Sequence, residues 1–171
     1  KEDQTIDRII FEKTSSLLKS KIIVSRQSSN DVLNKIQKSL SNNSSEKIIF
    51  NNDYNYSLNE NGFIYYEDKF GGIKLPNSNL VGEFQIDNIA TSIATIRSLN
   101  LKIKDNHIKT GITKIKSIAR LQEIKKGKIK DICKNNKIFV DGSHNPLGAK
   151  ALVDYLDTLN SNKHIIIGMM S

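Results

Sequence analysis

The chain has 171 residues, a formal net charge of +8, one cysteine and no tryptophan. Two prolines and nine glycines exclude a collagen-like or proline-rich chain, and no apolar run reaches the roughly 18 residues of a membrane span. The lone Cys133 cannot form an internal disulfide, which fits a protein of the reducing cytoplasm.

The positive charge first suggests a nucleic-acid-binding protein. However, Lys, Ile and Asn make up 67 of the 171 residues and Arg only four, so A/T-rich codons account for most of the lysines. The one dense basic run, residues 125–137, contains no aromatic residue and no arginine for phosphates or guanine edges. We therefore expect a solvated charged face there, and nucleic-acid binding is the weakest of the functions kept open below.

The first fifty residues alternate helical and extended patterns. Residues 5–19 are amphipathic, 21–25 are short and β-branched, 30–40 follow a serine-rich capping segment with apolar residues at helical spacing, and 47–50 form a second apolar run. This α-β-α-β order predicts a parallel sheet.

The middle of the chain changes character. Residues 53–76 alternate aromatic and polar side chains around a hairpin-type turn at Asn61-Gly62, which predicts an antiparallel excursion at the edge of the sheet. Helical spacing then predicts helices over 84–99 and 105–115. Residues 118–134 are predicted to form one or two strands around a Lys-Gly-Lys turn.

The C-terminal part has the pattern of one βαβ unit. Residues 137–140 predict a strand, 141–146 a turn, 147–159 a helix and 163–168 a second strand. Such a crossover is expected to be right-handed.

The turn of this unit carries the residues with the clearest chemical potential. Ligands bind beyond the carboxyl ends of strands in open α/β sheets, and Asp141 stands at such an end. Asn145 suits the N-cap and Pro146 the first helical position, with His144 beside them. The alternative is that these are only turn and cap residues. Ser143 and His144 are sequence neighbours and generally point apart, so they do not form a nucleophilic pair.

Five segments, in order along the chain, resemble one family. Asp141-Gly-Ser-His-Asn-Pro-Leu-Gly-Ala149 resembles the Asp-Gly-Ala-His-Asn-Pro-x-Gly-Ala motif of folylpolyglutamate synthases and bifunctional dihydrofolate synthases, in the Mur ligase superfamily. Thr5–Lys13 resembles their Thr-Ile-x-x-Ile-Ala-x-Glu-Lys segment, and Leu80–Ala90 their Leu-x-Gly-x-His-Gln-x-x-Asn-Ala segment. Ala119–Gln122 resembles Gly-Arg-Leu-Glu, and Ile165–Met169 a strand ending in Val-x-Gly.

The resemblance implies an α/β fold assembled from two part-domains. Residues 1–116 would be the later part of a Mur-ligase-type central ATP-binding domain. Residues 117–171 would open a Rossmann-like C-terminal ligase domain with its first βαβ unit.

The resemblance also implies an ATP- and Mg²⁺-dependent amide ligase. Such enzymes phosphorylate the carboxylate of a folate or dihydropteroate, and the amine of L-glutamate then attacks the acyl phosphate. By position, Lys13 matches a carbamylated lysine that helps to order magnesium, and Asn88 an asparagine that contacts adenine. Arg120 matches an arginine that reaches the ATP phosphates, Asp141 an acid that contacts the ribose, and His144 a histidine at the nucleotide and glutamate crevice.

The chain also departs from the family pattern. It contains no Gly-x-x-x-x-Gly-Lys-Ser/Thr phosphate loop and no Asp-His-x-x-x-Leu-Gly region with the magnesium-binding histidine. Phe84 replaces a histidine, Ser117–Ala119 replace Trp-Pro-Gly, and Thr14–Ser16 replace Ala-Gly-Ile. We expect a fragment that lacks the phosphate-loop region and most of the C-terminal domain and is inactive alone.

Three interpretations therefore remain open. The chain is a catalytic half that assembles with a separately encoded N-terminal half, a non-catalytic remnant of the enzyme, or a basic nucleic-acid-binding module that uses residues 125–137.

Overall fold

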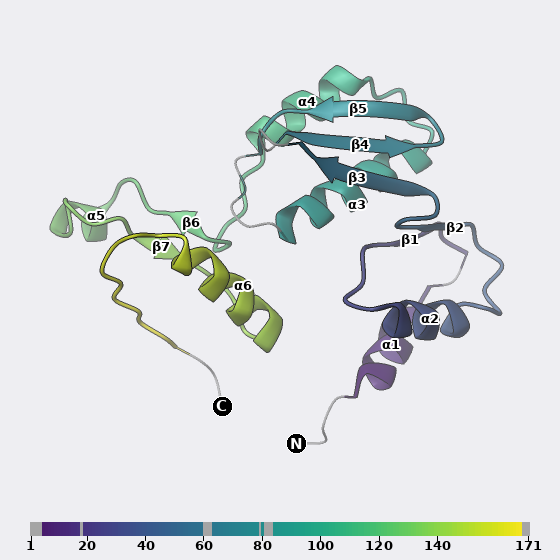
Figure 1. Ribbon diagram of the computed structural model, residues 1–171, viewed down its shortest axis with the longest axis horizontal. Helices are drawn as coiled ribbons and strands as arrows, with labels where there is room; N and C mark the ends of the chain where they lie inside the picture. Colours follow the sequence, from purple (N-terminus) through teal and green to yellow (C-terminus); the bar gives the residue numbers. More distant parts are fainter. Residues whose placement is uncertain (1–4, 18, 60–62, 79, 81–83, 169–171) are drawn as a thin grey trace.

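The computed structural model describes residues 5–17, 19–59, 63–78, 80 and 84–168. Figure 1 shows two groups of elements, one from residues 6–114 and one from residues 122–157. The predicted domain boundary after residue 116 lies between these groups and stays a prediction. No helix within the described residues is long and apolar enough to cross a membrane.

The first four elements confirm the predicted α-β-α-β order. They are α1 (Ile6–Thr14), β1 (Ile22–Val24), α2 (Asn30–Ser39) and β2 (Lys47–Ile49). The two strands pair in parallel, with Ile23 opposite Ile48. Ser29 is the N-cap of α2, because its side chain accepts a hydrogen bond from the Val32 N–H at 3.3 Å. A small core lies between the two strands and α2. Its buried residues are Ile22, Val24, Leu40 and Ile49, and Leu33 and Ile36 of α2 pack against them.

The apolar face of α1 is not buried. Ile6, Ile9 and Phe11 are exposed, and no residue of this helix is buried. Hydrogen bonding and charge attach α1 to α2: the Thr14 and Ser39 hydroxyl oxygens lie 2.7 Å apart, and Lys35 Nζ lies 3.3 Å from an Asp7 carboxylate oxygen. The amphipathic pattern therefore predicted the helix correctly, but its apolar face is not covered by other described residues.

The aromatic-rich middle segment forms the antiparallel meander that its alternation predicted. The strands β3 (Tyr54–Leu58), β4 (Ile64–Asp68) and β5 (Gly71–Leu75) pair in that order. The predicted Asn61-Gly62 turn lies outside the described residues. The meander is a separate three-stranded sheet that contributes to the larger core, so the prediction of an excursion at the edge of the parallel sheet was wrong. Its inward side chains are large and apolar on every strand, which requires a covering layer.

Two helices supply that layer, α3 (Phe84–Ser98) and α4 (Asp105–Lys114), and both confirm the sequence prediction. Their apolar residues pack on the meander in one cluster with the strands, which includes Tyr54, Ile64, Tyr66, Ile73, Leu75, Ile89, Ala90, Ile93, Ala94, Ile108 and Ile112. Arg97 ties these layers together. Its guanidinium donates to Asp68 Oδ1 and Asp105 Oδ1, each at 2.9 Å, and to the Gly71 carbonyl at 2.8 Å.

The C-terminal group differs from its prediction in two places. Its elements are β6 (Gln122–Glu123), α5 (Lys128–Ile132), β7 (Phe139–Val140) and α6 (Pro146–Asp157). Residues 128–132 were expected to be a strand but form a short helix, because Gly127 at φ 107° turns the chain and the Lys130 ammonium binds the carbonyls of Lys134 and Asn136.

The second strand of the predicted βαβ unit is also absent. Residues 163–168 are not assigned to any strand, and β7 pairs antiparallel with β6 instead. An extended segment becomes a strand only where a neighbour accepts its backbone hydrogen bonds, and among the described residues this segment pairs with none.

Candidate functional site

The turn between β7 and α6 is built as its sequence predicted. Asn145 is the N-cap of α6, since its side-chain oxygen accepts a hydrogen bond from the Gly148 N–H at 2.8 Å, and Pro146 occupies the first turn. The N-terminus of α6 therefore opens directly beside Asp141, Ser143 and His144.

Asp141 is the centre of this turn. Its Oδ2 accepts from the Leu121 N–H at 2.7 Å, and its Oδ1 accepts from the Ser143 N–H at 2.8 Å and from the Ser143 hydroxyl. Partial burial disfavours the charged form, but these hydrogen bonds and the positive charge of Arg120 outweigh it and lower the pKa of Asp141. The group is a carboxylate held by two separate backbone segments.

Arg120 projects from a strained loop next to this carboxylate. The residues on either side of it, Ala119 and Leu121, have φ of 52° and 48°. The Gly142 N–H donates to the Ala119 carbonyl at 2.7 Å, and a Cβ at Gly142 would lie only 3.2 Å from that oxygen. A side chain at Gly142 would therefore crowd this close approach, which brings the exposed arginine to the Asp141 turn.

His144 is exposed on the same turn. Its Nδ1 lies 3.0 Å from the Gly142 carbonyl oxygen, and because a carbonyl only accepts, Nδ1 carries the proton in this contact. In the neutral imidazole, Nε2 is then an acceptor. Arg120, Asp141 and His144 are thus gathered on two adjoining loops.

The other two predicted site residues lie elsewhere. Asn88 is exposed in α3, where its amide nitrogen donates to Oε1 of the buried Gln85 at 3.0 Å. Lys13 is exposed near the end of α1. Figure 1 shows α1, the helix that contains Lys13, well separated from α6, the helix that follows the Asp141 turn.

The surroundings of Lys13 do not form a magnesium site. No group of three or more His, Cys, Asp or Glu residues that could hold a metal ion occurs among the described residues. On α1 itself, Glu12 pairs with Arg8 at 3.3 Å and Asp7 pairs with Lys35. The carboxylates nearest to Lys13 in sequence are thus engaged with cations, and the metal role of a carbamylated Lys13 stays a prediction.

A polar network that no sequence pattern indicated lies beyond the carboxyl end of β1. Arg26 Nη1 donates to the Tyr56 hydroxyl at 3.2 Å, and that hydroxyl donates to Asp87 Oδ1 at 2.8 Å. Tyr54 donates to the Val24 carbonyl at 3.1 Å. Burial and the Asp87 contact raise the pKa of Tyr56. Strand alternation places Tyr54 and Tyr56 on one face, but no sequence pattern pairs them with α3.

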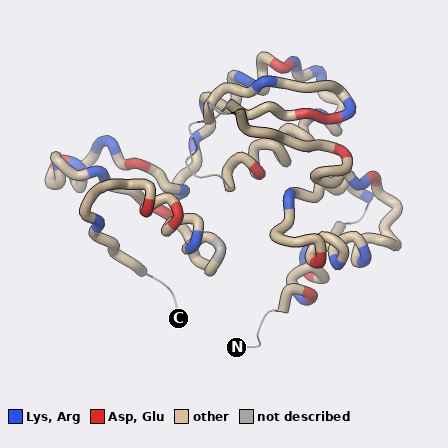
Figure 2. Tube along the Cα trace, in the orientation of Figure 1, with Lys and Arg blue, Asp and Glu red and all other residues tan. Residues whose placement is uncertain are grey.

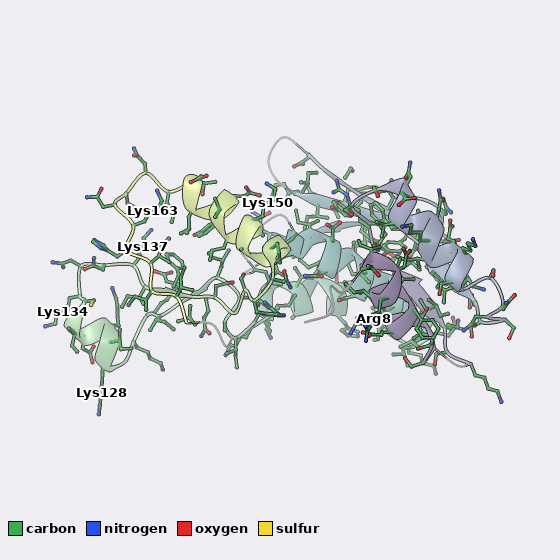
Figure 3. All side chains as sticks on the ribbon, turned by 90° about the horizontal axis from the view of Figure 1, so that it is seen from below. Arg8, Lys128, Lys134, Lys137, Lys150 and Lys163 are labelled. Atoms are coloured by element: carbon green, nitrogen blue, oxygen red, sulfur yellow. The ribbon has the colours of Figure 1, made fainter. Side chains whose placement is uncertain are left out.

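The basic run of residues 125–137 surrounds α5. Figure 3 shows Lys128 and Lys134 projecting outward at this end of the molecule, and Figure 2 shows lysines and arginines spread along the whole trace. Lys130 is committed to backbone carbonyls, and Lys125 lies 3.7 Å from a Glu123 carboxylate oxygen. The structure therefore does not concentrate the net charge of +8 on this segment.

Comparison with known proteins identifies the fold. The sequence matches no family model and no curated protein. The structure is similar to E. coli FolC in complex with DHPP and ADP, with a TM-score of 0.73 and 21% identity over 92% of this chain. It is also similar to folylpolyglutamate synthase from Thermotoga maritima (TM-score 0.72, 20% identity, 91% of this chain). A third similar structure is folylpolyglutamate synthetase from Lactobacillus casei (TM-score 0.67, 23% identity, 91% of this chain).

These similarities show that the chain has the fold of part of a folylpolyglutamate synthase. It spans 34% of the E. coli protein, 36% of the Thermotoga protein and 40% of the Lactobacillus protein. The predicted α/β, Mur-ligase-type fold class is thereby confirmed.

Proposed function

We propose that the chain is the adenosine-binding part of an ATP-dependent amide ligase of the folylpolyglutamate or dihydrofolate synthase type. The observation that carries this proposal is the fold together with the turn before α6, in which Asp141 accepts hydrogen bonds from the Leu121 and Ser143 N–H groups. In the complete reaction, ATP would phosphorylate a folate or dihydropteroate carboxylate, and L-glutamate would attack the acyl phosphate.

The C-terminal site residues have geometry suited to these roles. Asp141 is an ionised acceptor for a ribose hydroxyl, and Arg120 places the charge of a long, exposed side chain beside it for the phosphates. The N–H groups at the start of α6 add positive potential at the same place. His144 offers an acceptor nitrogen at the rim of this turn. Together these groups would bind an anionic nucleotide by its sugar and phosphates.

Asn88 would contact the adenine base from the other group of elements. Its Nδ2 is held by Gln85 Oε1, so the amide keeps one N–H and its carbonyl oxygen for a ligand. An asparagine amide with both groups available pairs with the N6 and N7 edge of adenine. Gln85 would thus fix the orientation of the amide.

Magnesium does not enter these steps. The described residues do not gather the oxygen ligands that magnesium needs around Lys13, so no step is assigned to the metal or to a carbamate. The 171 residues also contain no phosphate-loop motif. We therefore expect this chain alone to bind ATP without hydrolysing it, which agrees with a role beside a separately encoded phosphate-loop segment.

Calorimetric titration of the 171-residue chain with ATP tests the proposal. Asp141→Ala is expected to weaken ATP binding at least about tenfold, because a hydrogen bond to a charged group is lost. Arg120→Ala, at an exposed position, is expected to weaken it without unfolding the loop. Asp154→Ala on α6 is the matched control, since this exposed carboxylate pairs with Lys150 at 3.2 Å, and the variant should bind ATP as the wild type does.

Absence of ATP binding by the wild-type chain would overturn the proposal. Salt-dependent binding of DNA or RNA in place of ATP would favour the basic-module interpretation. Release of phosphate by the purified chain with a folate and glutamate present would contradict the expected inactivity.

A further inference from the structure

The Asp141 carboxylate has almost no acceptor capacity left for a ligand. Two carboxylate oxygens offer about four lone-pair positions. Oδ1 uses two of them, for the Ser143 N–H and the Ser143 hydroxyl, and Oδ2 uses one for the Leu121 N–H. One position, on Oδ2, is therefore open.

The Ser143 hydroxyl is confined where it sits. A Cβ built on Gly148, in the first turn of α6, would lie 3.0 Å from Ser143 Oγ and 3.2 Å from Ser143 Cβ. The serine side chain is therefore packed against the helix start. The neighbouring cap acceptor, Asn145 Oδ1, is already taken by the Gly148 N–H at 2.8 Å. Asp141 Oδ1 is the acceptor that this geometry leaves to the hydroxyl.

We propose that Ser143 sets the sugar specificity of the nucleotide site by occupying the second acceptor position of Asp141 Oδ1. This inference rests on the proposed function. A carboxylate with one open position on each oxygen binds both hydroxyls of a ribose diol. With Ser143 in place, Asp141 accepts from one ribose hydroxyl only. The affinity of the site then depends on one of the 2′- and 3′-hydroxyls and not on the other.

The Ser143→Ala variant compares a carboxylate that has one open acceptor position with a carboxylate that has an open position on each oxygen. The alanine keeps the backbone N–H that donates to Oδ1 and removes the hydroxyl, which opens one position on each oxygen. We expect ATP to bind about tenfold more tightly to Ser143→Ala than to the wild type, because one hydrogen bond to a charged group is added.

The decisive experiment compares ATP, 2′-deoxy-ATP and 3′-deoxy-ATP by calorimetric titration of the full 171-residue chain. The wild type is expected to lose about tenfold in affinity with one deoxynucleotide and to bind the other as it binds ATP. Ser143→Ala is expected to lose affinity with both. The ratio between nucleotides measured on one protein does not depend on the folded fraction of that protein.

The outcomes distinguish this inference from the function on which it rests. If the wild type binds no ATP, the proposed function fails and this inference fails with it. If the wild type binds ATP but loses affinity with both deoxynucleotides, or if Ser143→Ala keeps the wild-type ratios, the role of Ser143 is wrong while the proposed function stands. A Leu121 amide resonance unchanged in Ser143→Ala confirms that the loop is intact.

Discussion

The part of the chain before residue 116 contains two apolar clusters, whereas after residue 116 a single described side chain, Leu121, is buried. In the C-terminal group, Ile118, Ile129 and Ile132 are exposed, and Ile166 is 100% exposed. The N-terminal group is therefore held by packing. The C-terminal group is held by a few polar contacts, such as the Asp141 hydrogen bonds and the Asn145 cap.

The part of the chain that contains most of the packed core is therefore not the part that contains most of the candidate ligand-binding residues. The candidate ribose and phosphate residues lie in the group with little core, where a few polar contacts determine the shape of the loop. Regions with few buried apolar contacts open at lower free energy than packed cores. We therefore expect substitutions in the two groups to act on different observables, and three predictions sharpen the comparison.

The largest effect is expected in the N-terminal core. Tyr66 is completely buried, so Tyr66→Ala should lower the free energy of unfolding by about 4 kcal/mol through lost packing and a residual cavity. Ile166→Ala removes a side chain that contacts little protein, and its effect should stay within about 0.5 kcal/mol. Urea unfolding followed by circular dichroism measures both. Equal effects would show that the C-terminal segment is packed in solution.

A smaller effect is expected from the ion pairs. Arg97 and Asp68 have side chains only 11% and 7% exposed, so Arg97→Ala leaves a buried carboxylate without its partner and should cost about 3 kcal/mol. Lys150→Ala breaks the exposed pair with Asp154 on α6 and should cost less than about 1 kcal/mol. The same urea titration compares the two variants, and a similar loss in both would contradict the assignment of Arg97 to the core.

The smallest effect is the pH dependence of the Asp141 loop. Burial opposes ionisation of Asp141, but its hydrogen bonds to Ser143 and Leu121 and the charge of Arg120 lower its pKa below the unfolded value. Its contribution to stability is therefore present above about pH 4 and lost as the pH falls through the folded-state pKa.

Amide chemical shifts of Leu121 and Ser143 between pH 6 and pH 2 measure this transition. Both shifts should change together at a pH below the ordinary range of an aspartate. In Asp141→Asn, neither amide should show that step. A transition midpoint at or above the ordinary aspartate pKa would contradict the hydrogen bonds that Asp141 accepts from Leu121 and Ser143.

Much of the fold follows from patterns readable in the sequence. Helical spacing predicted α3 and α4, and alternation predicted the meander, because each element has a neighbour that covers its apolar residues. Prediction failed where that neighbour is missing. The segment 163–168, with three consecutive isoleucines, was expected to be a strand but forms none, and α5 depends on a lysine that reaches carbonyls four and six residues away.

The site was predictable only in part, for a related reason. Asn145 and Pro146 act through contacts within one turn, which their residue types predict. The Asp141–Leu121 bond joins positions 20 residues apart, and the network from Arg26 through Tyr56 to Asp87 joins the loop after β1 to β3 and α3. No local pattern specifies such contacts. The roles assigned to Lys13, Asn88, Arg120, Asp141 and His144 remain predictions.

The two left-handed residues around Arg120 impose a trade-off between folding and affinity. Each non-glycine residue in that conformation costs on the order of 1 kcal/mol, and the Leu121 bond to Asp141 offsets part of this cost. The two hydrogen-bonded sides of the carboxylate therefore differ in how freely they can change. If the proposed function holds, loss of the Ser143 hydroxyl would open a position for a ligand, whereas loss of the Leu121 hydrogen bond would let the backbone relax and move Arg120 away from the carboxylate.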